Sequence, residues 1–151
     1  MIREDLKKAL VDALKTKNEK KTATIRLINA AIKDKDIEAR PKGITDGIDD
    51  TAILSLLQSM VKQRKESIEM YKQGGREDLV ASEQAEIDII SAFLPQQMST
   101  EETKTAIESV IQELGASSIK DMGKVMGALK AKYAGQMDFS IASGLIKGLL
   151  A

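Results

Sequence analysis

The stretch Ala92-Phe93-Leu94-Pro95-Gln96-Gln97-Met98-Ser99-Thr100-Glu101-Glu102 decides the fold, because one helical region ends in it and another begins. Pro95 disfavours the helical conformation for the residue before it and has no backbone N–H, so a helix stops here. Ser99 and Glu102 have the spacing of a capping box, which marks the start of a new helix. We therefore predict two domains, residues 1–95 and 96–151.

Before this boundary, apolar residues recur at steps of three and four, the spacing of amphipathic helices. They predict an N-terminal helical domain of about four helices. The expected helices cover residues 3–17, residues 20–39, a long segment from Asp49 or Asp50 to the C-cap at Gly74-Gly75, and a segment from Arg76 to Pro95.

One charged residue, Arg64, falls on the apolar stripe of the third expected helix. Arginine is the residue best suited to a half-buried ion pair. We predict that Arg64 pairs with Glu83 or Glu86 of the fourth helix.

After the boundary, the pattern predicts a small C-terminal three-helix bundle. Its helices cover residues 100–114, residues 119–133, and a last segment capped by Asp138 or Ser140. With no predicted strand, the fold class is all-α. A bundle of about 55 residues is marginally stable unless it docks on a partner or on the first domain.

The composition limits the chemistry. The chain has no cysteine and no histidine, which removes disulfides, thiolate nucleophiles, the usual general base and the commonest zinc ligand. Acid–base chemistry by carboxylates would need a cluster of acids, which the sequence does not show. We therefore predict no catalytic residue, no metal and no cofactor. No apolar run approaches the length of a membrane span and no signal peptide is evident, so we expect a cytoplasmic protein with no membrane partner.

Charge is balanced overall, with 23 basic and 23 acidic residues, but it is unevenly spread. Residues 1–42 hold 12 Lys and Arg against 7 Asp and Glu, whereas residues 43–95 hold 5 against 10. Such a division can present a basic face on a neutral protein, although solvated helix faces give the same pattern.

The most informative candidate for a site is the segment 117–127. Ser118 and Asp121 have helix-opening spacing. Gly123 and Gly127 then follow at i and i+4, and each glycine in a helix interior costs about 1 kcal/mol relative to alanine. Close approach of another backbone, from protein or nucleic acid, would explain them.

Lysines surround these glycines, giving a local excess of positive charge, and the helix N-terminus adds backbone donors suited to phosphate. The candidate nucleic-acid-binding residues are Lys120, Gly123, Lys124, Gly127, Lys130 and Lys132. The alternative interpretation is that the glycines let neighbouring helices pack and that the lysines are only solvated.

Four stretches identify a resemblance to the GatB/YqeY family, whose members are similar to the tail of the B subunit of the tRNA-dependent amidotransferase. They are residues 25–33, residues 62–71 followed by 74–79, residues 92–95 and residues 121–127. The resemblance implies two all-helical parts. It also implies contact with tRNA rather than catalysis, because the chemistry of the amidotransferase happens in other domains. Residues 135–140 depart from the polar turn that family members often carry there.

The sequence therefore favours a non-catalytic protein that binds tRNA or is associated with it. The alternative is an adaptor that docks a protein partner. A weaker alternative is carbon–nitrogen ligase activity with glutamine as the amide donor, but we find no glycine-rich phosphate loop for it. The sequence leaves the oligomeric state open.

Overall fold

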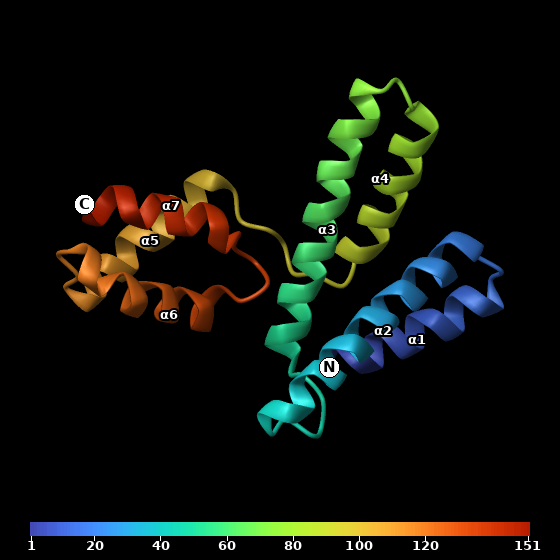
Figure 1. The fold of residues 1–151 in the computed structure, drawn as a ribbon, viewed down its shortest axis with the longest axis horizontal. Helices are drawn as coiled ribbons and strands as arrows, with labels where there is room; N and C mark the ends of the chain where they lie inside the picture. Colours follow the sequence, from blue (N-terminus) through green and yellow to red (C-terminus); the bar gives the residue numbers. More distant parts are fainter. The chain divides into compact units, whose positions relative to one another are not determined.

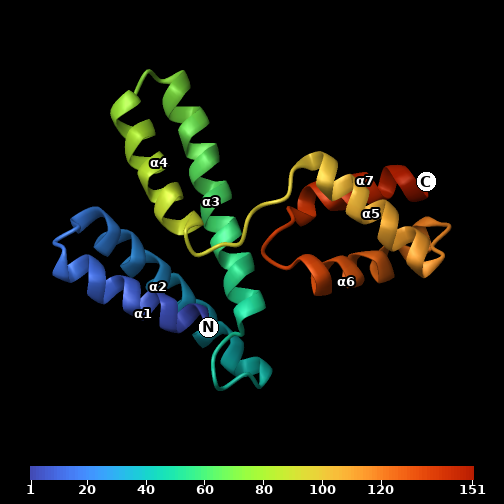
Figure 2. The same ribbon diagram turned by 180° about the vertical axis from the view of Figure 1, so that it is seen from behind.

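A computed structural model describes residues 1–151 and contains seven α-helices, two short 3₁₀ turns and no strand, so the predicted all-α class is confirmed (Figures 1 and 2). The α-helices are α1 (Ile2–Lys15), α2 (Glu19–Ala39), α3 (Asp50–Gln73), α4 (Glu77–Ser91), α5 (Thr100–Leu114), α6 (Met122–Tyr133) and α7 (Phe139–Leu150). The 3₁₀ turns are η1 (Arg40–Lys42) and η2 (Ile119–Asp121). By its contacts the chain divides into an N-terminal unit, Met1–Leu94, and a C-terminal unit, Pro95–Ala151. Independent folding of residues 1–95 and 96–151 stays a prediction.

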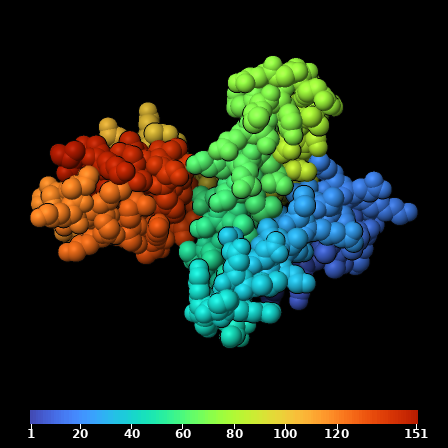
Figure 3. Space-filling model, viewed as in Figure 1, coloured from blue at the N-terminus to red at the C-terminus, as the bar shows by residue number.

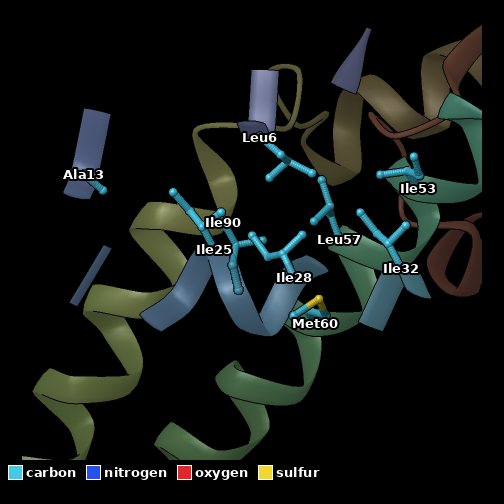
Figure 4. Packing of buried hydrophobic residues seen from close by; sticks show 9 residues of the cluster. All are labelled: Leu6, Ala13, Ile25, Ile28, Ile32, Ile53, Leu57, Met60 and Ile90. Carbon is cyan, nitrogen blue, oxygen red and sulfur yellow. The ribbon is translucent and has the colours of Figure 1, made fainter. Parts of the chain in front are cut away.

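The N-terminal unit consists of two helical hairpins, α1–α2 and α3–α4, in which α2 packs against α1, α3 and α4 (Figure 1). Figure 4 shows the isoleucines of α2 among side chains from the other three helices. Ile25 and Ile28 are fully buried there, as are Leu57 of α3 and Ile90 of α4. Burying one such side chain contributes about 1.5–3 kcal/mol, so α2 is the centre of this core.

Polar caps set the helix limits in this unit. The Asp49 carboxylate accepts from the N–H of Ala52 at 2.9 Å, which settles the start of α3 in favour of Asp49. At the other end of α3, only Gly75 adopts the left-handed conformation, with φ +70°. The first helix ends at Lys15, two residues earlier than predicted, because Lys17 turns the chain with φ +56°.

The predicted pairing of Arg64 is confirmed with Glu86. Arg64 Nε donates to Glu86 Oε2 at 2.8 Å, and the Arg64 side chain is only 15% exposed. Lys20 of α2 donates to the other oxygen of Glu86 at 3.3 Å. One carboxylate thereby links α2, α3 and α4. Charged hydrogen bonds of this kind are stronger than neutral ones.

A second polar cluster fixes the loop before α3. Both terminal nitrogens of Arg3 donate to the carboxylate of Asp36, at 2.8 and 3.0 Å, and one of them also donates to the carbonyl of Ile48. Asp36 in turn accepts from the N–H of Ile48 at 2.8 Å. Gly47, with φ +91°, lies against this cluster, where an added Cβ would be 2.7 Å from Arg3 Nη2.

The C-terminal unit packs α5, α6 and α7 around one apolar core. Its fully buried members include Ile107 of α5, Leu129 of α6 and Ile146 of α7. The capping box predicted for Ser99 and Glu102 is confirmed, with both hydrogen bonds at 3.1 Å.

The helix predicted over residues 119–133 is interrupted near its start. Residues 119–121 form the 3₁₀ turn η2, and regular α-helix begins only at Met122. The sequence shows the cap but not the change from 3₁₀ to α-helical hydrogen bonding.

Candidate nucleic-acid interface

Two glycines lie on the exposed side of α6. Gly123 and Gly127 are both exposed, and a Cβ added at either would meet no atom of the chain within 4 Å. The opposite side of the helix carries the buried Val125 and Leu129. Within the C-terminal unit, the interpretation that these glycines let neighbouring helices pack is therefore wrong, because neither α5 nor α7 approaches them.

Three lysines flank the glycines on this side. Lys120, Lys124 and Lys130 are exposed, and none of them takes part in an ion pair within the chain. From Lys124 to Lys130 the helix rises about 9 Å, at about 1.5 Å per residue. We call these three lysines with Gly123 and Gly127 the α6 outer face.

The sixth predicted residue, Lys132, lies apart from the α6 outer face. It follows the buried Leu129 by three residues, which places it at the edge of the packed side of the helix. Its Nζ donates to Glu113 Oε2 of α5 at 2.9 Å, and this hydrogen bond raises the pKa of Lys132. The structure thus brings together five of the six predicted residues, whereas Lys132 is engaged with α5.

The start of α6 differs from the prediction that its backbone donors are available to phosphate. The Asp121 carboxylate accepts from the N–H of Ser117 at 3.1 Å and from that of Ser118 at 3.4 Å. These bonds, helped by nearby Lys124, lower the pKa of Asp121, so its carboxylate stays charged. A phosphate at this helix end would meet that negative charge, which disfavours the helix start as a phosphate site.

The sequence analysis did not single out a second pair of exposed glycines, Gly144 and Gly148 on α7. They have the same i, i+4 spacing, and an added Cβ would again meet nothing within 4 Å. The spacing alone would have been enough to find them. Their surroundings are different, because Lys147 is the single charged residue of α7, and Leu149 beside it is 42% exposed. With a single lysine, this surface lacks the positive charge needed to bind phosphate groups.

The α6 outer face offers three ammonium groups and two glycine positions at which no side chain covers the backbone. In Figure 3 the surface of α6 is orange and that of α7 red. Lysine ammonium groups neutralise phosphates, and side-chain-free positions allow a close approach. No group of three or more acidic side chains is placed to hold a metal ion. None of the helices has the length and apolar character needed to cross a membrane.

Comparison with known proteins gives the family. The model of the YqeY-like protein family matches residues 3–150. The Altered inheritance of mitochondria protein 41, mitochondrial, of Eremothecium gossypii is 35% identical over 115 residues, which cover 75% of this chain and 58% of that protein. The protein of the same name from Pyrenophora tritici-repentis is 34% identical over 134 residues, covering 82% of this chain and 68% of the relative. The chain belongs to the YqeY-like protein family.

Proposed function

We propose that the C-terminal unit binds tRNA by its phosphate backbone, through the α6 outer face. The observation that carries the proposal is the pair of exposed glycines between three lysines that pair with no acid of the chain. Two such glycines cost about 2 kcal/mol of helix stability relative to alanine. No contact within the chain uses the space they leave, and a nucleic-acid backbone lying against α6 would use it.

The choice of tRNA among nucleic acids rests on the resemblance to the tail of the amidotransferase B subunit. The names of the relatives mention mitochondria and give no ligand. The chain spans 58% of the length of the first relative and 68% of that of the second, so the activity of those whole proteins is not carried over. We place this binding in the cytoplasm, as the sequence analysis expects, although the relatives are named as mitochondrial proteins.

The number of lysines fixes the expected salt dependence. Each neutralised phosphate contributes about 0.7–0.9 to the slope of log K against log salt concentration. Three contacts give a slope of about −2 to −3, or a loss of roughly 20- to 40-fold in affinity between 50 and 200 mM salt. Phosphate contacts of this kind give affinity without sequence specificity, so several tRNAs should bind alike.

Fluorescence anisotropy with labelled, unfractionated tRNA at 50 mM salt tests the proposal. The double variant Lys124→Glu, Lys130→Glu should bind at least tenfold more weakly, with a slope smaller by about 1.4–1.8. The matched control is Lys104→Glu with Lys147→Glu, since both residues are exposed cations of the same unit outside the α6 outer face.

Two results would refute the proposal. One is the absence of tRNA binding by the unmodified chain at 50 mM salt. The other is an equal loss of binding in the control variant, which would mean that net charge, and not the α6 outer face, holds the RNA. The weaker alternative, carbon–nitrogen ligase activity, predicts glutamine-dependent amide transfer by the purified chain, and we expect none.

A further inference from the structure

A groove lies at the end of the α1–α2 hairpin, far along the sequence from the α6 outer face. It has a volume of about 390 Å³, and its lining combines buried small residues, one aliphatic side chain and charged residues. The lining residues are Ala13, Leu14, Lys17, Glu19, Thr22 and Arg26. Ala13 and Thr22 are buried, whereas Leu14 is 50% exposed, so the groove has an apolar wall open to solvent.

A second, shallow hollow of about 330 Å³ lies along α1, nearer the N-terminus, and is lined by residues of this helix alone. Lys7, Lys8, Val11, Asp12 and Lys15 line it. Val11 is 50% exposed, like Leu14. We call the two hollows together the hairpin surface, which belongs to the blue region of Figure 3.

The hairpin surface carries a net positive charge. Its lining holds five cations against two acids, and none of the five cations takes part in an ion pair within the chain. Elsewhere in the N-terminal unit, by contrast, Lys20 and Arg64 are both paired with Glu86. The hairpin surface therefore offers positive charge that the chain itself does not neutralise.

The surface continues onto the outer side of α2. Arg26, Leu27, Ala30 and Lys33 are exposed there at helical spacing, and Leu27 is 48% exposed. This segment is part of the stretch 25–33 that supports the family resemblance, and neither the core nor the α6 outer face uses these four side chains. An amphipathic helix binds by laying its apolar face on exposed aliphatic side chains, and cations beside them can pair with acids on its polar face.

We propose that the hairpin surface binds an acidic amphipathic helix of a partner protein. An aliphatic residue of that helix packs against Leu14 and Val11, and its carboxylates pair with the surrounding lysines and Arg26. The half-exposed aliphatic side chains gain nothing from a phosphate backbone, and the carboxylates of Asp12 and Glu19 repel one. A protein helix satisfies both the apolar and the cationic parts of the surface.

The probe is a fluorescein-labelled synthetic helix of 18 residues with leucines on one side and glutamates on the other. Two control peptides are a scrambled sequence of the same composition, which has no apolar face, and the same helix with lysine in place of glutamate. Anisotropy titration of the full chain should show binding of the acidic amphipathic peptide at least tenfold tighter than that of either control.

Two variants locate the binding. Leu14→Gln removes the apolar contact, and Lys17→Glu with Arg26→Glu reverses the charge at the groove. Each should weaken peptide binding at least fivefold. The matched controls are Met70→Gln, an apolar residue that is 71% exposed on α3, and Lys65→Glu with Lys104→Glu, which should leave the affinity unchanged. Circular dichroism checks that every variant keeps its helices.

Three outcomes would overturn the proposal. The first two are equal binding of the three peptides and unchanged peptide binding in both groove variants. The third is loss of tRNA binding in the Lys17→Glu, Arg26→Glu variant, which would make the hairpin an RNA contact. Self-association of the chain that either groove variant abolishes would assign the surface to a second copy. The Lys124→Glu, Lys130→Glu variant separates the two proposals, because it should lose tRNA and keep the peptide.

Discussion

Replacing the two glycines of the α6 outer face by alanine should stabilise the C-terminal unit. The double variant Gly123→Ala, Gly127→Ala gains about 1 kcal/mol at Gly127 and less at Gly123, the second residue of α6, because alanine has the higher helix propensity and restricts the unfolded chain. No steric clash offsets this gain, since each added methyl group meets no atom within 4 Å. The free energy of unfolding of this unit should therefore rise by about 1–2 kcal/mol.

The two tyrosines make the measurement specific to the unit. The chain has no tryptophan, and Tyr71 lies in the N-terminal unit whereas Tyr133 packs against the C-terminal core. In a Tyr71→Phe background, tyrosine fluorescence therefore follows the C-terminal unit alone. At an m-value of about 1 kcal/mol/M in urea, the midpoint should rise by about 1–2 M.

A matched pair of glycines tests whether the effect is general. Gly144→Ala with Gly148→Ala on α7 adds the same methyl groups into equally open space, so it should raise the midpoint similarly, with a smaller gain at Gly148 near the end of the helix. An unchanged or lower midpoint for the α6 variant would refute the reasoning, since it would mean that something in solution occupies the space beside Gly123 and Gly127.

Two further predictions concern the polar clusters of the N-terminal unit. Glu86→Gln removes the negative charge that pairs with the half-buried Arg64 and should destabilise the unit by about 1–3 kcal/mol in urea unfolding. Glu83→Gln, at the alternative partner that the structure does not pair with Arg64, should change stability by less than about 0.5 kcal/mol. Equal effects of the two variants would contradict the structure. The hydrogen bonds from Arg3 hold the pKa of Asp36 below its usual value, so their stabilisation is present above the unfolded pKa of about 3.9 and is lost as pH falls through the lower folded value. The gap in thermal midpoint between the parent and Asp36→Asn should therefore be constant from pH 5 to 7 and shrink below about pH 4, and a gap that grows in acid would show that this sign is wrong.

Local signals predicted the helices well, whereas long-range contacts had to come from the structure. Asp49 and the Ser99–Glu102 box fix helix starts by bonds within three residues, which the sequence displays directly. The link from Arg3 to Asp36 spans 33 residues and depends on how the α1–α2 hairpin packs. No local pattern marks it.

In the candidate site, too, local spacing was predictable from the sequence and long-range contacts were not. Helical spacing grouped the lysines and glycines of α6 correctly, because side chains three and four residues apart share a face. Spacing also predicted the local capping pair of Ser118 and Asp121, but it could not show that Lys132 bonds to Glu113 on α5, since that contact depends on tertiary structure.

The even charge of the C-terminal unit makes the proposed RNA binding straightforward to test. Residues 96–151 hold six cations and six acids, so no long-range attraction adds to the contacts of the α6 outer face. Reversing two of its three lysines then removes most of the electrostatic attraction. If RNA bound instead through residues 1–42, which hold an excess of five cations, reversing the α6 lysines would leave that binding intact. Retained tRNA binding in Lys124→Glu, Lys130→Glu would therefore point to the N-terminal unit, and its loss would assign the RNA to α6.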